Sequence, residues 1–300
     1  MNDVDGTHLA TMAECLTEES LSIMYTKDLL NLNLKRSNYT TQHQTIKANM
    51  RAVLLDWLAD VCETFRLQRK TYYLATDFID RFLTISHDIP KEDLQLIGIT
   101  CLFIAAKFEQ TYLPRLSDFS YVTGGACTDE NILTKEGDIL KVLNWNLSRP
   151  VTPIDWLNFY LQSSVVENDD DSFSSPPKYC PLLYIKIAKL LDLCNLDITS
   201  LNFTPSVLVA TAIQYTFSPE LASRVSGYNT DTLQSCSEWM TPFAVTVGES
   251  EPPQLQTFKN KVSREDLHNI QTHVVNLETF KRVQTVREER DNTLLNKYVI

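Results

Sequence analysis

The chain has 300 residues and a formal net charge of -11, and only 7 of its residues are glycine. So little glycine argues against all-β sandwiches and glycine-loop nucleotide folds, which need glycine at their tight turns. The acidic charge argues against broad binding to a nucleic-acid backbone, because such binding relies on a surplus of lysine and arginine. No membrane span is expected either, since the longest apolar stretch, residues 94–108, is short and interrupted by polar side chains.

Hydrophobic spacing in the first half of the chain predicts helices. Residues 1–45 are polar and offer one short amphipathic helix. Residues 91–109 are apolar on almost every side, which is typical of the central helix of a bundle. Apolar residues recur at helical spacing before this segment and after it. The expected helices of this half span 50–62, 69–83, 91–109, 114–119 and 128–142.

The second half of the chain repeats this arrangement, with an apolar central helix over 204–217. Prolines mark several helix starts, because proline fits the first turn of a helix. A loop is expected over 245–258, and Ser263 is expected to cap a last helix whose apolar stripe is Leu267, Ile270, Val274 and Leu277. The charged segment 287–297 is expected to fray. The expected helices of this half span 153–162, 178–194, 204–217, 219–226 and 231–240.

Together these elements predict an all-α protein of two tandem five-helix bundles with flanking N- and C-terminal helices. Residues 1–45 form an N-terminal segment, 46–148 the first bundle, 149–247 the second bundle, and 248–300 a loop followed by a C-terminal helix.

The sequence lacks the common patterns of catalysis. It has no phosphate-cradling glycine-rich loop and no GxSxG motif. His268 and His273 are five residues apart, so on a helix they point about 140° apart and cannot share a metal ion. The seven cysteines are scattered without a CxxC pair, which argues against a zinc site and a disulfide framework. No metal, cofactor or catalytic residue is therefore expected, and the functional features should be surfaces that bind other proteins.

Several motifs resemble the cyclin family. Residues 50–58, MRAVLLDWL, are similar to the opening helix of the cyclin box, and the similarity continues through 78–82, FIDRF, and 102–109, LFIAAKFE. The resemblance covers roughly residues 20–280. Within the family the chain is most similar to the E-type, G1/S-specific cyclins, and the stretch 268–273, HNIQTH, is the most specific part of that similarity.

The resemblance implies a protein without enzymatic activity of its own. Cyclins bind a cyclin-dependent kinase, hold its αC helix inward and make its activation loop accessible to phosphorylation. A role at the G1/S transition of the cell cycle, in the nucleus and also in the cytoplasm, is implied in the same way. Two alternatives stay open: a mitotic-type cyclin, and a cyclin-fold adaptor for transcription or DNA, against which the net charge of -11 argues.

The same resemblance implies a kinase-binding surface around one lysine and one glutamate. Lys107 ends an apolar run, where a charge is costly unless it is paired. The alternative for Lys107 is a lysine that pairs only within its own bundle, and the alternative for the apolar positions is ordinary core packing. The positions implied in kinase binding are Lys107, Phe108, Glu136, Leu140, Trp145 and Leu147.

A second implied surface docks RxL-type peptides of substrates and inhibitors. Trp57 would supply apolar area there, and Asp60 would supply a counter-charge for a basic anchor. The alternative is that this helix face is entirely buried. Arg51 and Asp80 are implied to form a structural ion pair inside the first bundle. The positions implied in docking are Met50, Val53, Leu54, Trp57, Asp60, Leu94 and Gln95.

Overall fold

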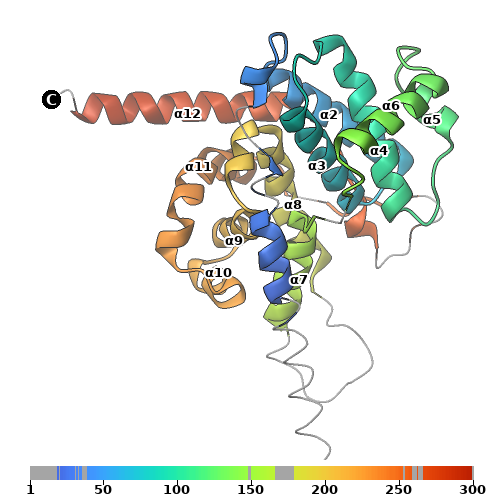
Figure 1. Cartoon of the computed structure of the whole chain (residues 1–300). Coiled ribbons are helices and arrows are strands. Elements are labelled where there is room, and N and C mark those ends of the chain that lie inside the picture. The colour runs from blue at the N-terminus through green and yellow to red at the C-terminus, as the bar shows by residue number, and fades with distance from the viewer. Residues whose placement is uncertain are drawn as a thin grey trace, which may run out of the picture.

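The computed structural model of the chain shows two helical bundles side by side, with a long C-terminal helix that projects from them (Figure 1). The two-bundle, all-helical fold expected from the sequence is therefore confirmed. The structure describes residues 19, 21–30, 32, 34–35, 39–147, 150–165, 179–252, 254–258, 262 and 266–298.

The first bundle is built around α4, the nearly all-apolar helix. Its residues from Ile97 to Ala106 are all buried, and α4 contacts the four other helices of the bundle. Helix α6 begins where the sequence places a cap, because the Thr128 hydroxyl accepts a hydrogen bond from the backbone N–H of Asn131 at 3.2 Å. The five helices are α2 (Ala48–Phe65), α3 (Arg69–Ile85), α4 (Leu94–Glu109), α5 (Leu116–Tyr121) and α6 (Asp129–Val142).

The second bundle repeats this plan around α9, which contacts its four other helices. Proline stands at the start of α8, α9 and α10, as the sequence predicts. The hydroxyl groups of Thr204 and Ser218 cap α9 and α10. The helices are α7 (Pro153–Val165), α8 (Pro181–Leu196), α9 (Pro205–Thr216), α10 (Pro219–Ser226) and α11 (Thr230–Gly248).

Helix α11 is longer than the sequence predicts. Its expected end at residue 240 is wrong, because the helix continues through Pro242 to Gly248. Proline lacks the N–H that would normally bond the carbonyl of residue 238, one turn earlier. In this fold the guanidinium of Arg290 donates to the Glu238 carbonyl oxygen at 2.8 Å. The α12 side chain thus satisfies the group that Pro242 leaves unpaired.

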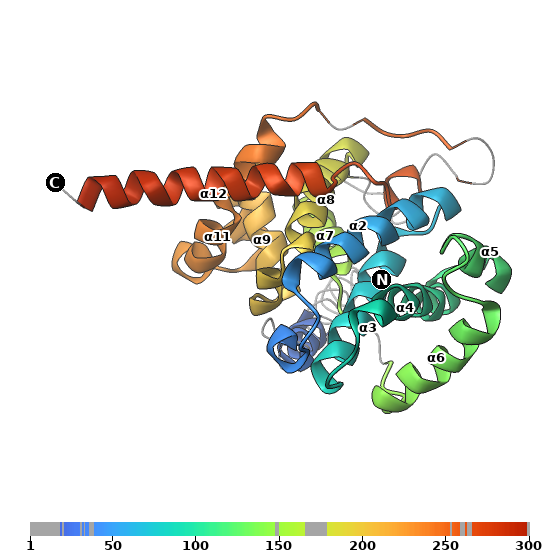
Figure 2. The ribbon, with the colours of Figure 1, turned by 90° about the horizontal axis from the view of Figure 1, so that it is seen from above.

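The last helix does not begin just after residue 263, as the sequence predicts. Residues 266–276, which we call the strap, lie extended except for one 3-10 turn, η5 (Leu267–Asn269). The expected cap, Ser263, lies outside the described residues. The last helix, α12, begins only at Leu277 and ends at Tyr298 (Figure 2).

Hydrogen bonds to the first bundle keep the strap extended. The guanidinium of Arg69 on α3 donates to the carbonyl oxygen of His268 and to the hydroxyl of Thr272, both at 3.1 Å. The backbone N–H of Gln271 donates to the Leu67 carbonyl oxygen at 2.9 Å. These tertiary bonds override the helical spacing of the apolar side chains, since propensity alone is a weak prior.

Residues 287–297, which the sequence expects to fray, lie within α12. The Arg287 guanidinium lies 2.9 Å from the Asp197 carboxylate and 5.5 Å from the centre of the Phe243 ring. These contacts tie the middle of α12 to the second bundle.

The N-terminal helix, described over residues 21–30, packs against the second bundle beside α7 (Figure 1). Asp28 is buried there and accepts hydrogen bonds at 3.0 Å from the Trp156 indole and from the backbone N–H of Ser206. Burial raises the pKa of the Asp28 carboxyl above its ordinary value. The first part of the chain is therefore anchored to a domain that starts more than a hundred residues later.

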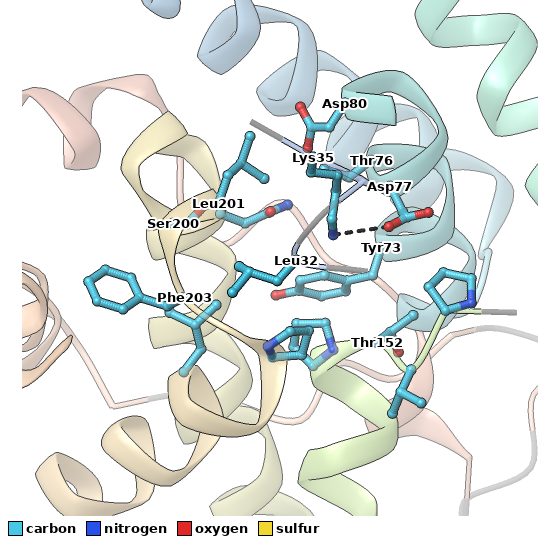
Figure 3. Close-up of a pocket in the computed structure, with 16 residues that line it drawn as sticks. Leu32, Lys35, Tyr73, Thr76, Asp77, Asp80, Thr152, Ser200, Leu201 and Phe203 are labelled. Carbon is cyan, nitrogen blue, oxygen red and sulfur yellow. Dashed lines mark ion pairs between the residues drawn. The ribbon is translucent and has the colours of Figure 1, made fainter. Parts of the chain in front are cut away.

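A small cavity of about 50 Å³ lies where this N-terminal segment meets both bundles. Figure 3 shows side chains from the two bundles around it, with Lys35 3.0 Å from the Asp77 carboxylate. The cavity is closed largely by packed residues, so it belongs to the joint between the bundles. None of the described helices is long and apolar enough to cross a bilayer, and the described residues contain no cluster of three or more metal-binding side chains.

Candidate protein-binding grooves

All six residues implied in kinase binding lie together in the structure. They line one open groove of about 600 Å³, to which the end of α4, the face of α6 and the turn after α6 all contribute. We call it the Lys107 groove. Its lining residues are Ile104, Lys107, Phe108, Glu136, Leu140, Trp145 and Leu147.

Lys107 and Glu136 form an ion pair at one side of this groove. The Nζ atom of Lys107 lies 2.7 Å and 2.9 Å from the two Glu136 carboxylate oxygens. It also lies 4.1 Å from the centre of the Phe103 ring, so the aromatic face helps hold the ammonium. The Lys107 side chain is still 39% exposed. The pair is therefore already formed, and it leaves hydrogen-bonding capacity for a partner's backbone.

An unusual turn holds Trp145 beside the pair. Asn144 and Trp145 both have positive φ, 51° and 55°. The backbone N–H of Trp145 donates to the Leu140 carbonyl oxygen at 2.8 Å, which closes the end of α6. Asparagine tolerates this conformation, but a bulky aromatic residue rarely adopts it. The backbone at Trp145 is therefore held in an unfavourable conformation, and this conformation places the indole at the surface, where it is 68% exposed.

The alternatives raised from the sequence have different outcomes here. Lys107 does pair within its own bundle, as its alternative states, but the pair faces an open groove. Ordinary core packing is wrong for Phe108 and Trp145, which are 41% and 68% exposed. Leu140 and Leu147 are half-buried and form the groove's apolar side.

Six of the seven residues implied in docking line a second groove, of about 420 Å³, between α2 and the start of α4. We call it the α2–α4 groove. The Val53 side chain is 51% exposed and Trp57 is half-buried, so the alternative of an entirely buried face is wrong. Asp60 does not line the groove but is exposed one turn beyond Trp57. The lining residues are Met50, Val53, Leu54, Trp57, Lys91, Glu92, Leu94 and Gln95.

Helix α4 carries parts of both grooves. Leu94 and Gln95 lie at its first turn, and Lys107 and Phe108 lie at its last. Thirteen residues separate Leu94 from Lys107, which is roughly 20 Å of helix. The two grooves can therefore be occupied at the same time by different segments.

Arg51 and Asp80 are paired in the interior. The Nε and Nη2 atoms of Arg51 each lie 2.8 Å from one Asp80 carboxylate oxygen, and both side chains are almost fully buried. The third nitrogen, Nη1, donates to the Asn195 carbonyl oxygen of α8 at 2.6 Å. The sequence placed this pair inside the first bundle, but it also fastens the two bundles together.

Sequence reasoning missed the acidic side of α2 and its contact with the strap. The Nε2 atom of His273 lies 2.8 Å from the Asp56 carboxylate, and the His273 backbone N–H donates to Glu63. This hydrogen bond with Asp56 raises the pKa of the His273 imidazole above its ordinary value. The spacing of Asp56, Asp60 and Glu63 marks one helix face, but no pattern in the sequence shows what covers it.

The two halves of the chain match two family models. Residues 19–148 match the model described as cyclin, N-terminal domain, and residues 151–276 match cyclin, C-terminal domain. The crystal structure of a viral cyclin from herpesvirus saimiri superposes with a TM-score of 0.58 at 19% identity, over 74% of this chain and 99% of that one. That likeness supports the fold.

Curated relatives are similar along most of the chain. G1/S-specific cyclin-E1 of Danio rerio is 44% identical over 254 residues, which are 85% of this chain and 61% of the relative. The Gallus gallus protein of the same name is 45% identical over 82% of this chain and 60% of its own length. G1/S-specific cyclin-E of Drosophila melanogaster is 38% identical over 87% of this chain and 41% of its own length. The chain spans about three fifths of the length of the vertebrate relatives.

Proposed function

Because this chain belongs to the cyclin family, we propose that it is a non-catalytic regulatory subunit that binds and activates a cyclin-dependent protein kinase. The observation that carries this proposal is the preformed Lys107–Glu136 pair beside an exposed apolar groove. A charged pair fixes the register of a partner, and an apolar rim supplies most of the binding energy.

Activation follows from rigidity. A partner element with two positions shifts toward the one that the groove binds better, by no more than the difference in binding free energy. The groove is rigid because α4 is buried through its centre and α6 is tied to it by the ion pair. We propose that the element is the kinase αC helix. Its inward position lets the kinase's own lysine–glutamate pair form.

We propose that the complex acts at the G1/S transition and is directed to substrates by the α2–α4 groove. The names of the curated relatives support the timing. The exposed apolar surface at Val53 and the neighbouring charge of Asp60 support docking of RxL-type peptides. The same proposal includes a nuclear location with a cytoplasmic fraction, which imaging of a tagged chain through the cell cycle would test.

Kinase binding is tested by mixing the purified chain with a monomeric cyclin-dependent kinase and assaying histone phosphorylation. Lys107→Ala with Glu136→Ala should reduce affinity roughly 30-fold or more, since interface hot spots contribute about 2 kcal/mol or more. The matched control is Lys135→Ala, which removes an ion pair with Asp93 outside the groove lining. Full binding by the double variant, with an unchanged far-UV circular dichroism spectrum, would refute the assignment.

Docking is tested separately with Trp57→Ala. Phosphorylation of substrates that contain an RxL motif should fall, while phosphorylation of short peptides without the motif should be unchanged. Equal loss for both kinds of substrate would show that the α2–α4 groove does not select substrates.

A further inference from the structure

The strap, from the opposite end of the chain, contacts a face of α2 that adjoins the face lining the α2–α4 groove. The bridge between Gln68 and Ile270 starts the contact just beyond α2. Figure 2 shows the segment before α12 running beside α2. Within this segment, His273 hydrogen-bonds to Asp56 and Glu63. Residues of the C-terminal part therefore lie beside a groove that belongs entirely to the first bundle.

Helix geometry links this contact to the groove. Val53, Trp57 and Asp60 follow one another at spacings of four and three residues, so they share a stripe on α2. Asp56, Asp60 and Glu63 share the adjacent stripe for the same reason. Asp60 thus belongs to both stripes, so its position on α2 lies between the residues that line the groove and the acidic residues that the strap contacts.

The strap changes which of these carboxylates a ligand can reach. Asp56 is engaged by the His273 imidazole, and their side chains are 16% and 26% exposed. Glu63 accepts from the strap backbone. Asp60 is exposed; its charge acts on the His273 imidazole, but no hydrogen bond joins its carboxylate to another described residue. A basic side chain that arrives at the end of the groove therefore meets one available carboxylate on α2.

We propose that His273 sets the selectivity of the α2–α4 groove for basic side chains, by holding Asp56 away from any peptide docked there. With the imidazole in place, Asp60 receives a single basic residue that flanks the apolar anchor. Without it, Asp56 lies one helical turn from Asp60 and receives a second basic residue. This inference rests on the proposed docking function. It assigns His273 the role of a positioning residue, since His273 acts through Asp56.

The test measures the affinities of two labelled peptides by fluorescence anisotropy on the full chain. The peptides share an apolar anchor and carry either one or two arginines before it. His273→Gln should strengthen binding of the two-arginine peptide about 2- to 5-fold, the range expected for a new exposed ion pair. Binding of the one-arginine peptide should change much less. The matched control is His87→Gln, which replaces an exposed histidine away from the groove lining.

Adding Asp56→Asn to His273→Gln should remove the gain, because the carboxylate that receives the second arginine is then absent. If His273→Gln alters both peptides equally or neither, the strap only supports the fold and the inference is overturned. If the unmodified chain binds neither peptide, the proposed docking function itself fails, and the inference fails with it.

Discussion

Replacing Trp145 with alanine should weaken kinase binding far more than it weakens the fold. The indole is 68% exposed in the free chain. A tryptophan side chain offers about 150–250 Å² for burial, so a partner that covers the ring completely removes roughly 100–170 Å² from water. At about 25 cal/mol per Å² this burial contributes about 2.5–4 kcal/mol. The dissociation constant should therefore rise roughly 60- to 1,000-fold.

The assay is titration calorimetry of the variant against an unphosphorylated monomeric kinase, with thermal unfolding of the free variant alongside. Alanine meets the same positive φ as tryptophan, so the backbone demand at this turn is unchanged. Trp145→Phe is the control, because it keeps most of the apolar area. A loss of affinity below about 3-fold would show that the indole does not contact the kinase. A matching loss of stability would attribute the weaker binding to a damaged fold and refute the prediction as well.

Three further changes test the interior and the strap. Arg51→Ala should lower the free energy of unfolding in urea by about 3–5 kcal/mol, because it leaves the buried Asp80 carboxylate without its partner. The control, Arg282→Ala, removes an exposed ion pair with Glu249 and should lower it by less than about 1 kcal/mol. Gly98→Ala should lower peptide affinity without changing kinase affinity. The new Cβ would lie 2.7 Å from Cδ1 of Leu54, so Leu54, which lines the α2–α4 groove, would have to move. Equal loss of affinity for both partners would contradict this prediction. The pKa of His273 is raised above 6.5 in the folded chain, mainly by its hydrogen bond with Asp56. The His273–Asp56 contact therefore stabilises the fold fully below pH 6.5, and this stabilisation is lost as the pH rises through the raised pKa. The melting temperatures of the chain and of His273→Gln should therefore converge with rising pH. A difference in melting temperature that stays constant with pH would show that the His273–Asp56 contact does not cause the difference in stability.

Helices that depend on local chemistry are predictable from this sequence. The apolar period of α4, the hydroxyl cap at Thr128 and the proline at the start of α9 each act within one or two turns. Each of these signals depends only on residues close together in the sequence, so it predicts a helix without knowledge of the fold. The Lys107 groove was expected only through the family resemblance, because periodicity alone does not distinguish a groove from a core.

Features that depend on distant residues were not predictable. Helix α11 passes Pro242 because Arg290 supplies a hydrogen-bond donor from another helix. The segment around Ile270 has the apolar spacing of a helix, yet Arg69 and other first-bundle groups hold it extended. In both cases the deciding hydrogen bond joins residues far apart in the sequence, where no local pattern can record it.

The strap also has a consequence for how the protein is made. Its hydrogen bonds join positions 199, 210 and 217 residues apart along the chain. Contacts of such wide separation carry a large loop-closure entropy and form late in folding. During translation, the strap therefore cannot cover the acidic face of α2 until almost the whole polypeptide has left the ribosome. All residues that line the Lys107 groove precede the strap by more than a hundred positions, so they are synthesised well before the segment that covers this face of α2.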